Sequence, residues 1–204
     1  MKNNKKIQIL CFVILLFVMG ACKKDNETSL DLPPCIDANG KVYKTVKIGT
    51  QIWMAENLAY KPDSGNFWAY DNNQSYVAIY GYLYDWEIAK KICPTGWHLP
   101  SDGEWTQLID YLGSYEVAGG KMKATSGWDI PNTGATNSSG FSALPGGFHR
   151  IDGSFDFVGH GCFWISTHDD VGDAYKRGIY WNHTGIYRYD TYQGEGYSVR
   201  CLLD

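Results

Sequence analysis

Positive charge is not in surplus in this sequence: 18 Lys and Arg residues stand against 22 Asp and Glu residues, a formal net charge of −4 at pH 7. Because a nucleic-acid partner needs many basic contacts to its phosphates, we expect none here. Methionine is scarce at 4 residues, whereas 23 Gly, 15 Tyr and 8 Trp are present. This composition argues against a coiled coil or a disordered tail and indicates a loop-rich domain with many tight turns.

The common catalytic and metal-binding signatures are missing as well. The sequence has no G-x-S-x-G elbow, H-E-x-x-H pair, phosphate-binding loop or dinucleotide fingerprint. It has no C-x-x-C pair and no Cys/His spacing of the kind that binds zinc. We therefore expect a protein that is not an enzyme and that carries no organic cofactor.

The longest apolar run lies in the N-terminal segment. Three lysines precede the apolar residues 7–19, and the small residues Gly20 and Ala21 follow. The run is too short for a membrane-spanning helix, which needs about 20 apolar residues. A basic start, a short apolar stretch and small residues at the cleavage position are typical of a secretory signal peptide. We predict that residues 1–21 are a signal peptide rather than an uncleaved anchor helix.

Residues 19–22, Met-Gly-Ala-Cys, resemble the lipobox of bacterial lipoproteins. The resemblance implies that Cys22 becomes the new N-terminus and enters the lipid bilayer through several acyl chains. Residues 22–34 are polar and end in two prolines, so we expect a tether. Residues 23–27 resemble the charged stretch that directs lipoproteins of the Bacteroidota type to the cell surface, although a plain solvated linker explains them too. We expect the protein at the outer membrane or cell surface of a Gram-negative bacterium.

A first helix is predicted over residues 82–93. Tyr84, Ile88 and Ile92 are spaced four apart, and the following Pro94 blocks continuation.

A second helix is predicted from Ser101 to Gly113. Ser101 and Glu104 have the spacing of a capping box. The apolar residues that follow at helical spacing are Trp105, Leu108, Ile109 and Leu112. Gly113 can take the left-handed conformation that ends a helix.

The remaining chain shows strand and loop patterns. Residues 41–58 alternate around a Gly-Thr turn and indicate a hairpin. Residues 121–160 lose the helical period and carry many glycines among aromatic residues, so we expect a long Gly-rich loop region. Strands are expected at residues 162–166, in a hairpin over residues 175–192, and at residues 196–203. This order of elements, helices first and antiparallel strands last, predicts the α+β class.

Six cysteines are present, of which Cys11 leaves with the signal peptide and Cys22 carries lipid. The four that remain are Cys35, Cys93, Cys162 and Cys201. Four thiols allow three pairings, and the oxidising environment of an exported domain permits disulfides without requiring them.

Three segments resemble one known family, the Fibrobacter succinogenes major paralogous domain. They are residues 93–101 (CPTGWHLPS), residues 140–147 (GFSALPGG) and residues 198–201 (SVRC). Residues 41–58 are similar to the opening of that family, so the resemblance extends over residues 41–204. We treat residues 35–204 as a single domain of this kind.

The resemblance implies an exported lipoprotein with a C-type-lectin-like architecture, related to the fold of formylglycine-generating enzymes. In that fold a cysteine of the first helix bridges to the final strand, which implies a Cys93–Cys201 disulfide here. Cys35 and Cys162 then either pair with each other or stay buried thiols. The sequence departs from the family at residues 161–167, where the family usually has paired tryptophans and serines and no cysteine.

Candidate ligand-binding residues lie in two aromatic runs around a predicted turn. They are Tyr180, Trp181, Asn182, Tyr187 and Tyr189, together with Trp164 in the preceding strand. Aromatic rings offer a large contact area at low entropic cost, so they suit a sugar or a protein ligand. The alternative is a hairpin whose rings alternate between core and solvent.

Calcium is the one cofactor for which the sequence offers candidate ligands. Asp169, Asp170 and Asp173 supply three nearby carboxylates, whereas calcium needs six to eight oxygen ligands. The EF-hand spacing and the sugar-binding tripeptides of calcium-dependent lectins are absent, and a solvated loop explains the same residues. We expect His98, in the tight corner before the second helix, to satisfy backbone groups rather than to act in catalysis.

These patterns predict an envelope lipoprotein whose lectin-like domain binds an extracellular glycan or protein. Residues 121–173 and the 175–192 hairpin would form its recognition face. The first alternative is a structural component of an envelope or adhesin assembly. The second is an oxidase of the formylglycine-generating type, which would need Cys35 and Cys162 as its cysteine pair but lacks the motif of that family around them.

Overall fold

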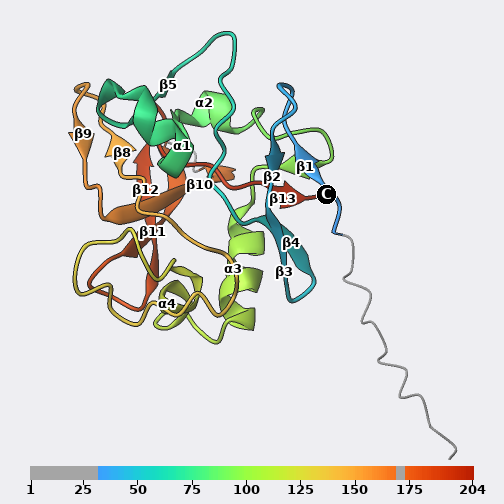
Figure 1. The fold of residues 1–204 in the computed structure, drawn as a ribbon, viewed down its shortest axis with the longest axis vertical. Coiled ribbons are helices and arrows are strands. Elements are labelled where there is room, and N and C mark those ends of the chain that lie inside the picture. The colour runs from blue at the N-terminus through green and yellow to red at the C-terminus, as the bar shows by residue number, and fades with distance from the viewer. Residues whose placement is uncertain (1–31, 169–172) are drawn as a thin grey trace, which may run out of the picture. The chain divides into compact units, whose positions relative to one another are not determined.

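A four-stranded antiparallel sheet joins early strands of the domain to its last strand (Figure 1). This computed structural model describes residues 32–168 and 173–204, with the backbone alone at residues 160, 162–168 and 173. The sheet contains, in spatial order, β3 (Thr45–Ile48), β4 (Gln51–Met54), β13 (Leu202–Leu203) and β7 (Trp97–His98). Leu202 pairs with Trp53 on one side and with His98 on the other. The hairpin predicted within residues 41–58 is confirmed as β3 and β4.

A three-stranded antiparallel sheet contains the longest strands. Its order is β10 (His160–His168), β11 (Asp173–Tyr180) and β12 (Ile186–Tyr192). The strand predicted at residues 162–166 and the hairpin predicted at residues 175–192 are confirmed. The strand predicted at residues 196–203 is wrong in extent, since only β13 is a strand there. Gly196 and Tyr197 form isolated bridges instead, to His149 and Tyr84.

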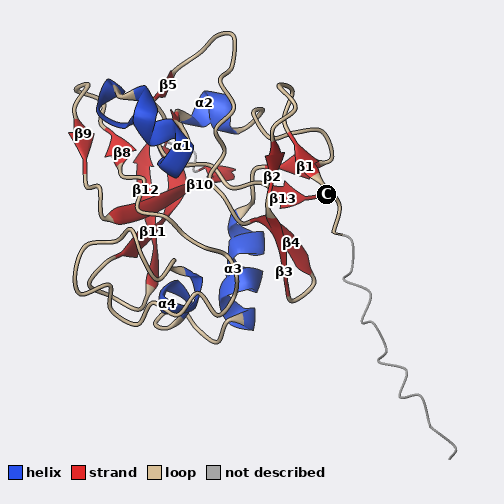
Figure 2. Cartoon of the chain, viewed as in Figure 1, coloured by secondary structure: helices blue, strands red, loops and turns tan. Residues whose placement is uncertain are grey.

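Short strand pairs and short helical segments complete the domain (Figure 2). The strand pairs are β1 (Cys35–Ile36) with β2 (Val42–Tyr43), β5 (Phe67–Trp68) with β6 (Leu83–Tyr84), and β8 (Phe148–His149) with β9 (Phe155–Asp156). The short helical segments are η1 (Tyr70–Asn72), η2 (Gln74–Tyr76), α1 (Val77–Tyr80), α2 (Trp86–Ala89) and α4 (Ala118–Met122). Helices mixed with antiparallel sheets confirm the α+β class. Within the described ranges, no helix has both the length and the apolar character needed to cross a bilayer.

Helix α3 (Asp102–Tyr111) is the longest helix among the described residues and confirms the second helix prediction. The Ser101 hydroxyl accepts from the Glu104 N–H, and the Glu104 carboxylate accepts from the Ser101 N–H at 2.7 Å. This reciprocal capping box satisfies two backbone donors that the first turn of a helix leaves open. At the other end Gly113 has a φ of 120° and ends the helix.

The first helix prediction, residues 82–93, is wrong. Leu83 and Tyr84 form β6, and the helix α2 that follows lasts only one turn. Asp85 begins that turn, because its carboxylate accepts from the Ile88 N–H at 2.9 Å. Tyr84 exchanges backbone hydrogen bonds with Tyr197, so tertiary pairing overrides the helical spacing of the apolar residues.

The disulfide implied by the family resemblance is present. Cys93 and Cys201 are joined with an S–S distance of 2.07 Å and a Cα–Cα distance of 5.8 Å. Cys93 lies in a bend after α2 rather than on a helix, and Cys201 directly precedes β13. Cys35 is a free, fully buried thiol. The side chain of Cys162 lies outside the described residues.

Among the described residues, two apolar clusters form the core, one on each face of the four-stranded sheet. One surrounds Met54, Tyr84 and the disulfide, and the other surrounds Trp53 and Trp105. The Trp53 ring lies 4.9 Å from that of Trp105, centroid to centroid. Strand β4 therefore contributes to both clusters, since adjacent residues of a strand point to opposite faces.

Arg200 anchors the glycine-rich segment to this core. Residues 123–147 contain no named helix or strand. The fully buried guanidinium donates to the carbonyls of Ser142 (2.7 Å), Phe141 and Met54 (3.1 Å), and to the Asn57 side chain (2.9 Å). Burial lowers the pKa of Arg200 to about 9. These four acceptors offset the cost of burying its charge.

Candidate ligand-binding groove

The β11–β12 hairpin presents a row of aromatic side chains on one face. In its antiparallel register, Gly178 lies opposite Tyr187 and Lys176 lies opposite Tyr189. Residues directly opposite each other point to the same face of a sheet, as do residues two apart along a strand. Tyr180, Tyr187 and Tyr189 therefore share the face of Gly178.

These rings and the adjoining turn line an open cavity of about 440 Å³, which we call the aromatic groove. It is lined by Tyr180, Trp181, Asn182, His183, Tyr187 and Tyr189. The ring of Tyr180 lies 5.9 Å from that of Tyr187 and 6.4 Å from that of Tyr189, between centroids. The structure thus brings together five of the six residues that the sequence singled out for ligand binding. The sixth, Trp164, belongs to β10, and its side chain lies outside the described residues.

Next to the turn, the opposite face of the hairpin carries aliphatic side chains. Ile179 and Ile186 pair with each other and are buried in the second core cluster. The tyrosines of the groove are not needed to fill that core, and Tyr189 keeps 40% of its surface exposed. The alternation expected for a hairpin is present, with isoleucines on the core side and three tyrosines on the groove side.

Gly178 forms the floor beneath two of these rings. A Cβ atom at this position would lie 2.9 Å from the Tyr180 hydroxyl oxygen and 3.1 Å from the Tyr189 ring. Both distances are shorter than ordinary contact. The absence of a side chain at Gly178 therefore lets the rings lie against the sheet.

Lys123 supports the turn of the hairpin from inside the domain. Its side chain is fully buried, and its ammonium donates to the carbonyls of Thr133 (2.8 Å), His183 (2.9 Å) and Tyr180 (3.0 Å). A fourth carbonyl, that of Trp181, lies at 3.4 Å. Burial lowers the pKa of Lys123 to about 8. Three of these four carbonyls belong to residues that line the groove, so one cation fixes the backbone beneath it.

Helix α4 and the loop after it hold the same turn from a second side. The Gly120 N–H donates to the Thr184 carbonyl, and the Thr133 N–H donates to the Trp181 carbonyl, both at 2.7 Å. A Cβ at Gly119 would lie 2.1 Å from the Gly185 carbonyl oxygen, so only glycine permits this approach. The turn is therefore positioned before any ligand binds, which reduces the entropy lost on binding.

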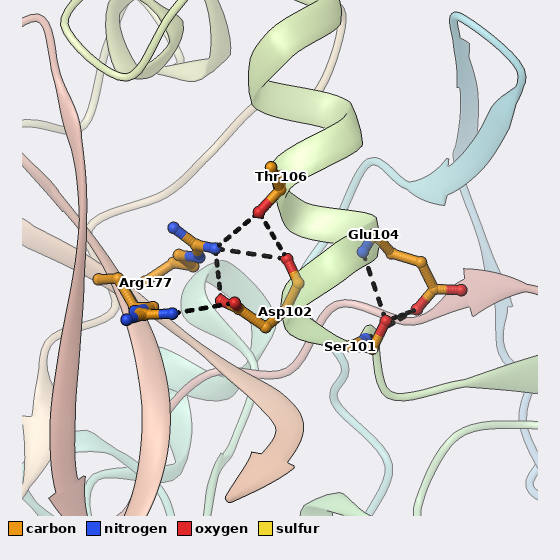
Figure 3. A network of polar contacts seen from close by, with 6 residues as sticks. Ser101, Asp102, Glu104, Thr106 and Arg177 are labelled. Carbon is orange, nitrogen blue, oxygen red and sulfur yellow. Dashed lines mark hydrogen bonds and ion pairs between the residues drawn. The ribbon is translucent and has the colours of Figure 1, made fainter.

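An ion-pair network fixes the other face of the hairpin to α3 (Figure 3). Asp102, in the first turn of α3, accepts from Arg177 at 2.6 Å and from Arg188 at 3.0 Å. The same Arg177 nitrogen lies 3.5 Å from the Thr106 hydroxyl. Burial lowers the pKa of Arg177, and the Asp102 charge opposes that effect. The two arginines come from directly paired positions of β11 and β12, so the contact fixes both strands.

A comparison with protein families decides where the chain belongs. The model of the Fibrobacter succinogenes major domain matches residues 46–202. The chain belongs to this family. The match includes both cysteines of the disulfide, helix α3 and the whole β11–β12 hairpin, so the aromatic groove lies within the Fibrobacter succinogenes major domain itself. No curated protein and no solved structure matches the chain.

In this Fibrobacter succinogenes major domain, His98 contacts carboxylates rather than the backbone groups we expected. Its Nε2 lies 2.9 Å from Glu104 and its Nδ1 lies 2.7 Å from Asp204. Burial lowers the pKa of His98, but the hydrogen bonds to Asp204 and Glu104 outweigh it, and the pKa is raised overall. The expectation was wrong because Asp204 comes from the far end of the sequence. The contact joins β7, α3 and the residue after β13.

The carboxylates proposed as calcium ligands lie outside the described residues: Asp169 and Asp170 entirely, and Asp173 by its side chain. In the part of the Fibrobacter succinogenes major domain that the structure describes, no three His, Cys, Asp or Glu side chains gather as a metal site would require.

Cys35 is unsuited to the oxidase hypothesis. Its thiol is fully buried, and burial raises its pKa to about 12, with the Asp37 charge adding to the shift. The thiolate is the reactive form of cysteine, and almost none of it exists at neutral pH with such a pKa.

A second cavity of the domain, of about 600 Å³, opens beside β3 and α1. None of the described residues that line it is aromatic. The side chain of Asn57 at this cavity is already bonded to Arg200 and to the Tyr80 carbonyl. This second cavity offers no aromatic surface for stacking, and the Asn57 amide already has partners. We therefore place the candidate site in the aromatic groove.

Three residues of the groove region were missed from the sequence. His183 follows Trp181 and Asn182 in the turn, and this adjacency to two candidate residues could have indicated that it lines the groove. Gly178 interrupts an aromatic strand, which can mark a close approach. Lys123 gave no signal, because its partners are backbone carbonyls of residues as many as 60 positions away.

Proposed function

We propose that this protein is an exported, lipid-anchored envelope lipoprotein whose aromatic groove binds extracellular carbohydrate. The observation that carries the proposal is the gathering of Tyr180, Trp181, Tyr187 and Tyr189 with two polar turn residues around one cavity. Sugar rings have apolar C–H faces that stack on aromatic rings, and hydroxyls that need hydrogen-bond partners at the edge. Asn182 and His183 supply such partners.

The charge of the groove favours a neutral ligand. Among the described residues that line it, none is Asp, Glu, Lys or Arg. A groove built to hold a charged peptide or a phosphate would be expected to present an opposite charge. A neutral glycan meets this requirement, and its repeating units suit an open cavity on a sheet face.

The cellular setting rests on the sequence. Residues 1–21 have the pattern of a signal peptide, and Cys22 has the position of the acylated cysteine; both lie outside the described residues. A tether over residues 22–34 would then separate the domain from the bilayer. We interpret the domain as C-type-lectin-like and related to formylglycine-generating enzymes, and the Cys93–Cys201 disulfide supports that interpretation. We propose no enzymatic activity, and the burial of Cys35 supports that choice.

A glycan array tests the proposal. The mature protein, with Cys22→Ser to keep acyl chains away, is applied to the array, and each glycan that binds is titrated by calorimetry. Trp181→Ala and Tyr187→Ala are each expected to weaken binding by about 5-fold to 150-fold, since stacking rings contribute on the order of 1–3 kcal/mol to such sites.

The matched control is Tyr111→Ala, which removes a ring that is 66% exposed on α3 and lies outside the groove. It should leave affinity unchanged. An array without any bound glycan, or equal loss of affinity in Tyr111→Ala and Trp181→Ala, would contradict the proposal. Capture of one stoichiometric protein from envelope extracts, abolished by Trp181→Ala, would instead favour the assembly-component alternative.

A further inference from the structure

Strand β12 forms an edge of the three-stranded sheet, because in the described part of the chain it pairs with β11 alone. An edge strand presents unpaired backbone N–H and C=O groups to its surroundings. The side chains of Arg188, Tyr189 and Asp190 are all exposed. The middle of this edge is therefore open to a second strand.

The direction of the backbone groups along β12 follows from one hydrogen bond. The Ile186 N–H donates to the Tyr115 carbonyl at 2.9 Å and so points away from β11. Backbone groups alternate in direction along an antiparallel strand, and the β11–β12 register has no shift. The N–H and C=O groups of Arg188 and Asp190 therefore also point outward, while those of Tyr189 point toward β11.

The outward edge is complementary to itself. When two copies of β12 lie antiparallel with Tyr189 opposite Tyr189, Arg188 of each copy lies opposite Asp190 of the other. The same register places the outward N–H and C=O groups of both strands face to face, which permits four backbone hydrogen bonds. Opposite charges at directly paired positions stabilise a sheet.

The neighbouring registers do not place opposite charges at directly paired positions. Outward groups face each other again only after the centre moves by one residue, to Arg188 or to Asp190. The first of these shifts puts Arg188 opposite Arg188, and the second puts Asp190 opposite Asp190. Like charges directly opposite are destabilising, so the charge pattern selects the register centred on Tyr189.

We propose that two copies of this protein associate edge to edge through β12, forming a symmetric dimer with Tyr189 on the two-fold axis. The three-stranded sheet of each copy becomes half of a continuous six-stranded sheet, and the interface is the same patch on both copies. Arg188 keeps its contact to Asp102 through Nη1 and has further guanidinium N–H groups for Asp190 of the second copy.

The dimer has a consequence for recognition. Directly paired residues point to the same face, so the two aromatic grooves lie on one face, on either side of the axis. Two grooves on one rigid sheet can bind a single polymer, which raises avidity through effective concentration. This consequence rests on the proposed function, whereas the pairing of the strands does not.

A covalent trap tests the register. In the proposed register Tyr189 faces itself at a non-hydrogen-bonded position, where Cα atoms lie about 4.5 Å apart, within the range of a disulfide. The mature protein carrying Cys22→Ser and Tyr189→Cys should form a covalent dimer under mild oxidation, seen on a non-reducing gel. Tyr192→Cys is the control, since Tyr192 is more exposed, at 64%, but lies opposite Ile186.

Charge variants test the pairing in solution. Asp190→Lys and Arg188→Glu each create like charges across the axis, so each alone should sediment as a monomer, with circular dichroism like that of the parent. Mixed together, they restore opposite charges at every pair and should form a 1:1 heterodimer. The proposal is supported if residue 189 cross-links efficiently, residue 192 does not, and the mixed charge variants form the heterodimer.

Three results would overturn it: no cross-link at residue 189, equal cross-linking at residues 189 and 192, or a parent protein that sediments as a monomer even at millimolar concentration. If Arg188→Glu fails to fold, Asp190→Lys and the two cysteine variants still decide the question. Carbohydrate takes no part in these measurements, so their outcome is independent of the glycan-array result.

Discussion

Lys123 is a cation that the described part of the domain surrounds with carbonyl oxygens and with no carboxylate. A buried ammonium without hydrogen bonds would cost far more free energy than a small domain can supply. Three short hydrogen bonds and a fourth carbonyl offset that cost, and the Trp128 ring lies 5.6 Å from the ammonium. The residue therefore links the loop after α4 to the turn of the β11–β12 hairpin.

Lys123→Met tests this role. Methionine retains most of the volume of the side chain but leaves the carbonyls without their donor, and a buried unsatisfied polar group costs about 1–3 kcal/mol. We expect a loss of about 2–3 kcal/mol in the free energy of unfolding by denaturant, together with weaker ligand binding in the groove. Lys121→Met is the control, because Lys121 is exposed and its ammonium donates to one carbonyl among the described residues, that of Leu112. Equal stability of Lys123→Met and the parent would contradict the role.

At the scale of elements, His98 joins β7 to the start of α3 and to Asp204. Its folded-state pKa is raised above the ordinary value, so its contribution to stability is complete below the unfolded pKa and is lost as the pH rises through the folded pKa. The pKa of Glu104 is lowered overall, since burial raises it but hydrogen bonds from Ser101 and His98 outweigh burial. The Glu104 contribution is lost only as the pH falls through its folded pKa.

The His98 contact should therefore lose its contribution to stability as the pH rises above the ordinary histidine pKa of about 6.5 and through the raised folded-state pKa, and His98→Gln should remove that loss. The difference between parent and variant is expected to stay below about 1 kcal/mol, because the contact is partly exposed and screened by water and salt. Denaturant unfolding across this pH range measures it, with Asp204→Asn as a second variant that removes one partner. If the free energy of unfolding of His98→Gln changes with pH in parallel with that of the parent, the His98 contact does not contribute to the pH dependence of stability.

The elements also show which parts of the fold local sequence can predict. Helix α3 was predictable because its capping box and apolar spacing lie within one stretch, and the structure obeys both. Residues 82–93 showed similar spacing, but their apolar side chains enter the core from a strand, a single helical turn and a bend. The same spacing of apolar residues arises from both arrangements, and the long-range pairing of Tyr84 with Tyr197 is one of the contacts that favour the second.

The candidate site likewise has a part that local sequence can predict and a part that it cannot. Alternation along β12 places Tyr187 and Tyr189 on one face, but only the register of β11 against β12 places Tyr180 on that face with them. The support beneath them was not predictable, because Lys123 acts through backbone carbonyls, which carry no residue-specific signal in a sequence. Contacts of this kind become visible only when the packing of distant segments is known.

At the scale of the whole molecule, one covalent bond spans most of the domain. The Cys93–Cys201 disulfide closes a loop with a sequence separation of 108 and ties the bend after α2 to the start of β13. Many of the connections inside this loop are irregular, so the unfolded chain would gain much conformational freedom without the bond. In the chain-entropy model a loop of this length contributes about 4–5 kcal/mol.

The double variant Cys93→Ala and Cys201→Ala should therefore lose a large part of the 5–15 kcal/mol that a domain of this kind typically has. Guanidinium unfolding measures the loss, and a reducing agent should lower the midpoint of the parent to that of the variant while leaving the variant unchanged. Cys35→Ala is the control, since it removes a buried sulfur that closes no loop. If the double variant unfolds at the same denaturant concentration as Cys35→Ala, the stability of the domain comes from its two apolar clusters, and the disulfide contributes little beyond them.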